Sequence, residues 1–74
     1  MEASSLIKMA NQIGTFFESM PNHQQALEDI ATHLKRFWAP KMRKIIVDCI
    51  DQKQDAEMMD IVREAINTHR DLLV

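Results

Sequence analysis

Two prolines constrain the fold most strongly, because each one ends a stretch of apolar residues with helical spacing. Apolar side chains recur at intervals of three and four residues before Pro21, and again between Pro21 and Pro40. A proline disfavours helical geometry at the residue before it, so each is expected to mark the end of a helix. Gly14 is the only glycine, and a chain with so few turn residues and many Leu, Met, Ala and Glu favours helices. The sequence therefore predicts an all-α fold.

The apolar pattern predicts a compact bundle of about four short helices joined by short loops, forming one helical domain over residues 1–74. The expected spans are about 5–20, 23–38, 40–51 and 56–73. Short connections make neighbouring helices roughly antiparallel or sharply angled.

Polar side chains at the expected helix starts predict the caps. Ser4 or Ser5 can cap the first helix, because a hydroxyl accepts hydrogen bonds from the free N–H groups of the first turn. Asn22 can cap the second helix, and Gln25 completes a pattern like a capping box. Asp55 can cap the last helix.

A core of this size is marginal, so the chain needs good packing or a partner. Cys49 is the only cysteine, which excludes a disulfide within the chain. His23, His33 and His69 do not lie at zinc-ligand spacing, so no metal site is expected. The start of the chain does not resemble a signal peptide, and no stretch approaches the roughly 20 apolar residues of a membrane span. We expect a cytoplasmic protein.

The stretch "HLKRFWAPKMRK", residues 33–44, gathers five of the nine Lys and Arg residues, although the chain has a net charge of −2. Two cations fall near the end of the second expected helix, and three fall in the first turn of the third. They are Lys35, Arg36, Lys41, Arg43 and Lys44. Cations at a helix start oppose the helix dipole. Ala39 also offers no capping side chain, so this joint is an anion-binding arrangement.

The third expected helix has an unusually wide apolar face. Six apolar side chains cover roughly 200° of its circumference at about 100° per residue: Met42, Ile45, Ile46, Val47, Cys49 and Ile50. A helix on the surface of a domain needs a stripe of roughly 100°. This helix is therefore either central in the bundle or in contact with a second protein.

Two plainer interpretations of the joint remain open. Phe37 and Trp38 are most simply core aromatics that close the joint, and the basic cluster can be a solvated charged face. If the joint instead binds a partner, we expect Trp38 and Arg43 to be the strongest contacts. Lys41 and Lys44 would then act as rim charges that steer association.

No catalytic constellation stands out, because the sequence has no Gly-rich phosphate loop, nucleophile elbow or paired-carboxylate motif. Two classes of function follow from the residues. One is a protein-interaction module or small subunit that docks through the third helix and the joint. The other is a nucleic-acid binder with basic side chains on phosphates and Trp38 stacked on a base. The acidic total charge favours the first class, because nucleic-acid-binding domains are usually much more basic.

Two motifs resemble a known family. "MANQIGTFF" and "FWAPKMR", with "HL" shortly before the second, are similar to the delta subunit of the bacterial NAD-dependent, molybdenum-containing formate dehydrogenases. The matching positions are Met9 to Ile13, Phe16, Phe17, Ile30, Ala31, His33, Leu34, Phe37, Trp38, Pro40, Met42 and Arg43. "IVREAI", residues 61–66, matches the last helix of the family, where Asp60 stands in place of a frequent proline.

The resemblance implies a non-catalytic accessory subunit that binds or stabilises the other formate dehydrogenase subunits, most of all the large catalytic one. The complex carries molybdenum as bis-molybdopterin guanine dinucleotide, iron–sulfur clusters and FMN in those other subunits, and it uses NAD. No cofactor is expected in this chain. The predicted partner-binding residues are Lys35, Arg36, Phe37, Trp38, Pro40, Lys41, Met42, Arg43 and Lys44. The alternative is a small nucleic-acid-binding or homodimeric module.

Overall fold

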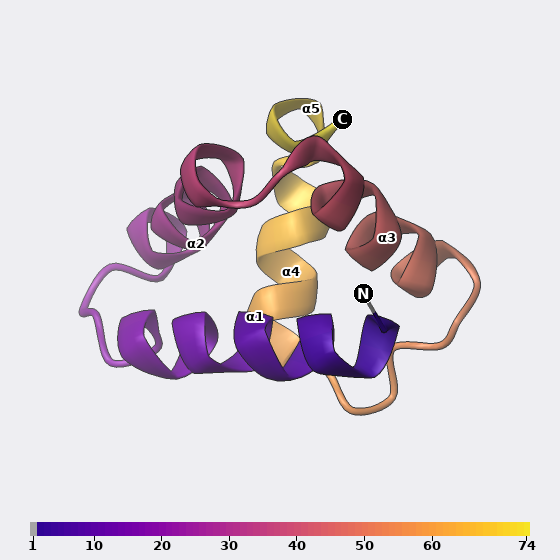
Figure 1. Cartoon of the computed structure of the whole chain (residues 1–74). Helices are drawn as coiled ribbons and strands as arrows, with labels where there is room; N and C mark the ends of the chain where they lie inside the picture. The colour runs from indigo at the N-terminus through magenta and orange to yellow at the C-terminus, as the bar shows by residue number, and fades with distance from the viewer. Residues whose placement is uncertain (1) are drawn as a thin grey trace.

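A computed structural model describes residues 2–74, and over this range it contains five α-helices and no strand (Figure 1). The helices are α1 (Ala3–Phe17), α2 (His23–Phe37), α3 (Pro40–Asp51), α4 (Asp60–Thr68) and α5 (Arg70–Leu73). The predicted all-α fold is confirmed. None of these helices has both the length and the apolar character needed to cross a membrane.

Helix α4 lies in the middle of the molecule, with α1 across its first turns and α2 and α3 on opposite sides (Figure 1). The core forms where the apolar stripes of these helices meet. Its largest fully buried side chains are Leu6, Leu27, Ile30, Leu34, Ile46, Val62 and Ile66. Helix α3 contacts α1, α2 and α5, and the partly buried members of its wide apolar face pack on the core. The wide face is therefore used within the chain.

The starts of α2 and α3, which were predicted from Asn22 and Pro40, are confirmed. The Asn22 side chain accepts a hydrogen bond of 3.0 Å from the Gln25 backbone N–H at the start of α2. The Gln25 side chain turns to Asp29 instead of back to Asn22, so the reciprocal half of the capping box is absent. Pro40 is the first residue of α3, and Ala39 makes no side-chain cap.

The predicted ends of α1 were wrong by two or three residues. The helix begins at Ala3 rather than Ser5, and neither serine caps it, because the Leu6 N–H bonds to the Glu2 carbonyl and extends the first turn. It ends at Phe17 rather than Met20, which precedes Pro21. The chain leaves the helix a turn before the proline, so that the residue next to Pro21 is no longer helical.

The predicted start and length of the last helix were also wrong. Asp55 does not cap it, because its carboxylate accepts a hydrogen bond from the Arg63 guanidinium, and α4 begins at Asp60. The helix then breaks at His69, whose backbone leaves helical geometry, and α5 follows as a separate short helix. His69 itself is half-buried.

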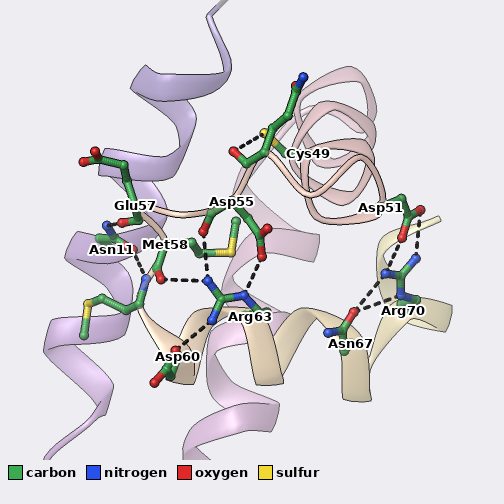
Figure 2. Close-up of polar contacts among 12 residues, drawn as sticks. Asn11, Cys49, Asp51, Asp55, Glu57, Met58, Asp60, Arg63, Asn67 and Arg70 are labelled. Atoms are coloured by element: carbon green, nitrogen blue, oxygen red, sulfur yellow. Dashed lines mark hydrogen bonds and ion pairs between the residues drawn. The ribbon is translucent and has the colours of Figure 1, made fainter.

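A network of side-chain hydrogen bonds holds the connection between α3 and α4 (Figure 2). The Asn11 amide donates to the Glu57 carbonyl at 2.9 Å and accepts from the Met59 N–H at 2.9 Å. Arg63 donates to the Asp55 carboxylate and to the Asp55 and Met58 carbonyls. These contacts pair the backbone groups of the turn that precedes α4.

Ion pairs lower the pKa of two carboxylates, one in this connection and one at the end of α3. The hydrogen bond from Arg63 holds the pKa of the Asp55 carboxyl below its usual value, although partial burial opposes this shift. The Asp55 side chain is only 15% exposed. The hydrogen bond from Arg70, the first residue of α5, likewise lowers the pKa of Asp51 at the end of α3 (Figure 2). One ion pair ties the connection to α4, and the other ties the end of α3 to the start of α5.

Helix α1 approaches α4 closely at Gly14, which is buried. A Cβ atom built at this position would lie 2.6 Å from Val62 Cγ2 and 3.4 Å from Ile61 Cγ2. The distance to Val62 is shorter than van der Waals contact, so only glycine leaves room for α4. The glycine within the "MANQIGTFF" motif is thus a packing residue.

Candidate interaction surface

The joint between α2 and α3 is a sharp turn with one aromatic ring inside and one outside. Helix α2 ends at Phe37, and Trp38 and Ala39 are extended before Pro40 starts α3. Trp38 is 6% exposed, which agrees with the interpretation of this ring as a core aromatic. Phe37 is 69% exposed, so that interpretation does not hold for Phe37. Because the helix stops one residue before Trp38, the chain turns there, and only the second ring faces the core.

Arg43 binds the end of the preceding helix. Its Nη1 donates hydrogen bonds of 2.9 Å to the Lys35 carbonyl and 2.9 Å to the Trp38 carbonyl. The last carbonyls of a helix lack partners within that helix, and a cation favours the negative end of its dipole. A cation that opposes the dipole of α3 is therefore stabilised by α2. This intrachain contact was not foreseen from the sequence.

The remaining cations of the joint lie on the outside. Lys35, Arg36 and Lys41 are exposed, and within residues 2–74 they form no ion pair with a carboxylate. Lys44 is also exposed and pairs with Asp48 at 3.2 Å. The Arg36 guanidinium lies 5.9 Å from the centre of the Phe37 ring, a cation–π contact. Positive charge and an exposed aromatic ring thus share the last turn of α2.

An aromatic row continues from this turn toward the end of α1. We use this name for Phe16, Phe17, His33 and Phe37. The ring centres of Phe16 and Phe17 are 5.0 Å apart, those of Phe17 and His33 are 6.5 Å apart, and those of His33 and Phe37 are 4.7 Å apart. The two ends of the row are the most exposed, since Phe16 is 76% exposed. The row therefore bridges α1 and α2 on the surface.

The apolar spacing before Pro21 would place Phe16 with the buried side chains, yet Phe16 is exposed. Adjacent helical residues point about 100° apart, so Phe16 and Phe17 cannot both lie at the centre of one stripe. This angle could have indicated from the sequence that one of the two rings points away from the core.

An open hollow of about 420 Å³ lies beside the aromatic row, between α1 and α2. Met9, Ile13, Phe17, His33 and Trp38 line most of it, and Phe16 and Gln12 complete the lining. Trp38 thus connects the interior of the joint with the wall of the hollow. The surface available to a partner is wider than the predicted joint and includes an apolar depression.

The nine predicted site residues divide into two groups. Lys35, Arg36, Phe37, Pro40, Lys41 and Lys44 are exposed, whereas Trp38 is buried and Met42 and Arg43 are partly buried. Because Trp38 is covered, it offers no free ring face on which a base could stack. Within residues 2–74, no three His, Cys, Asp or Glu side chains form a group that could hold a metal ion.

Comparison with known proteins gives one family. The model of the family described as NADH-dependent formate dehydrogenase delta subunit FdsD matches residues 5–66, from the first turn of α1 to the second turn of α4. This range includes the aromatic row, the hollow and the joint. No significant match was found among curated proteins or among solved structures.

Proposed function

Since this chain belongs to the family of the NADH-dependent formate dehydrogenase delta subunit FdsD, we propose that it is a non-catalytic subunit that binds and stabilises the other subunits of that complex. The contact is made by the outer face of the α2–α3 joint. The large catalytic subunit is the favoured partner, and the complex works in the cytoplasm. Molybdenum cofactor, iron–sulfur, FMN and NAD chemistry belong to the other subunits in this proposal.

One observation carries the assignment of the surface: unpaired cations lie beside an exposed aromatic ring on a rigid turn. Lys35, Arg36 and Phe37 occupy the last turn of α2, and Lys41 lies across the joint. Aromatic and Arg side chains are enriched where proteins bind each other. Such a surface suits a partner with carboxylates, because complementary charge steers association and fixes the register.

Four members of the joint serve this surface indirectly. Pro40 fixes the backbone at the start of α3, and Arg43 ties that start to two carbonyls at the end of α2. A surface that is already ordered loses little conformational entropy on binding. Trp38, Pro40, Met42 and Arg43 are therefore positioning residues, and the exposed cations and Phe37 make the contact.

The experiment measures the affinity of the purified chain for the remaining formate dehydrogenase subunits from the same source. The double variant Lys35→Gln/Arg36→Gln should bind at least about tenfold more weakly, and its affinity should depend less on salt. Lys53→Gln is the matched control, because Lys53 is an exposed cation in the connection after α3, outside the joint. It should leave the affinity unchanged.

Helical content and melting temperature confirm that each variant folds. Equal affinity of the double variant and the parent chain would refute the joint as the binding surface. Formate-dependent reduction of NAD by the pure chain would refute the non-catalytic role.

A further inference from the structure

The aromatic row leaves two large apolar side chains in solvent, and one of them, Phe16, lines the hollow. Among the described residues, Phe16, Phe37 and Val74 are the exposed large hydrophobic side chains. Two of these three therefore belong to one row, whereas the other large apolar residues of the described range are buried or partly buried. Clustered exposure of this kind marks interaction sites, whereas scattered single residues do not.

The hollow has the lining of a site for an apolar side chain. Met9 and Ile13 come from α1, His33 comes from α2, and Trp38 comes from the joint. Phe17 lies between them and contacts the His33 ring edge to face. Methionine adapts its shape to different neighbours, and aromatic rings supply large contact areas with few rotatable bonds. An aliphatic or aromatic side chain can enter beside Phe16, which is part of the lining, and next to Phe37, which contacts His33.

The charge beside the hollow indicates what accompanies that side chain. Arg36, in the last turn of α2, lies against the Phe37 ring, and Phe37 in turn contacts His33 of the lining. No carboxylate of the described chain forms an ion pair with Arg36. The nearest carboxylate before Arg36 on α2 is Asp29, about two turns away, and it accepts a 2.9 Å hydrogen bond from Gln25. Positive charge therefore lies next to the aromatic row at the joint.

We propose that the hollow receives an apolar side chain from an acidic segment of another protein subunit, one of whose carboxylates lies against Arg36. This proposal rests on the proposed function and names the chemistry of the partner segment. The apolar contact supplies most of the residence time of the complex, because side chains buried at the centre of an interface govern dissociation. Arg36 orients the segment.

A second copy of the chain is a poorer occupant. In a two-fold dimer, the same patch of each copy faces the other. Such a contact would bring Arg36 of both copies to one interface, where like charges oppose association. An acidic segment of a different subunit meets no such repulsion.

The test again uses the purified remaining formate dehydrogenase subunits from the same source as the binding partner. Phe16→Ser and Phe37→Ser should each weaken binding at least about tenfold, mainly through faster dissociation. Phe16→Leu keeps an apolar side chain and should lose less. Gln24→Ser is the control on an exposed position in the first turn of α2, and it should bind like the parent chain.

The outcomes separate this inference from the proposed function. If the two Phe→Ser variants bind like the parent while Lys35→Gln/Arg36→Gln binds weakly, the hollow is not the docking site and the subunit role stands. If the free chain is a dimer that Phe16→Ser dissociates, a second copy covers the hollow and the inference is wrong. If none of these variants weakens binding, both proposals fail.

Discussion

Helix α1 presents two different faces, one toward α4 and one toward the hollow. On the first face, Gly14 packs closely against α4, and the Asn11 amide forms hydrogen bonds with the turn that precedes α4. On the second face, Phe16 projects into solvent beside an open depression. The same helix thus carries residues that folding requires and residues that folding does not use.

This contrast separates the residues of the "MANQIGTFF" motif that stabilise the fold from those that are available for binding. Asn11 and Gly14 can be accounted for by packing and hydrogen bonding alone. Phe16 cannot, because an exposed phenylalanine gains little from burial in the free chain. Substitutions on the first face should therefore change stability, and substitutions on the second should change binding.

The largest expected effect on stability is at Gly14. Gly14→Leu should lower the free energy of unfolding by about 3 kcal/mol, because the new side chain collides with the buried, stiff Val62. Urea unfolding measures this change. Phe16→Leu, two residues away, is the control and should change stability by less than about 0.5 kcal/mol. Equal destabilisation by both variants would contradict the division between the two faces.

The next effect is at Asn11. Asn11→Ala should cost about 1–2 kcal/mol, because the Met59 N–H and the Glu57 carbonyl lose their partner. Hydrogen exchange of the Met59 amide should become faster. Asn11→Asp keeps the acceptor for Met59 but not the donor to Glu57, so its loss should be smaller. Unchanged exchange at Met59 in Asn11→Ala would show that the amide does not hold this turn.

The smallest effect is the response to acid. The pKa of Asp55 is lowered in the folded chain by the hydrogen bond from Arg63. Its contribution to stability is therefore complete above the ordinary carboxyl pKa of about 4 and is lost as the pH falls through the lower folded value. Asp55→Asn should be less stable at neutral pH and should lose less stability below about pH 4.

Unfolding curves at several pH values measure this difference. Glu28→Gln, on an exposed position of α2, is the control and should keep the acid response of the parent chain. An acid response of Asp55→Asn identical to that of the parent would refute the role of this pair.

Local signals were enough for much of the fold. Pro21, Asn22 and Pro40 set the middle breaks, because proline geometry and side-chain caps act within a few residues. The start of α4 could not be predicted in this way. Asp55 is a good capping residue by type, but Arg63 engages its carboxylate and Asn11 holds the turn from 46 residues away. Contacts between distant segments override a local preference.

The division of the predicted interaction surface into exposed and buried residues depends on the exact residue at which α2 ends. One residue in the length of α2 decides whether Phe37 or Trp38 faces the core, and periodicity does not define a helix end that sharply. The contact of Arg43 with the end of α2 depends on the angle of the joint, which the sequence pattern does not specify. The basic character of the region was evident from the sequence, but the division of its residues between inside and outside required the structure.

The Asn11 amide has a consequence for how the chain is made. Its two hydrogen bonds join the first helix to groups 46 and 48 residues further along the chain. A growing polypeptide cannot form them until Met59 has been synthesised, so α1 cannot complete its native contacts before the later residues are present. Long-range contacts of this kind slow folding and make it a single cooperative event. We therefore expect that a cut in the loop between α1 and α2 leaves no folded half.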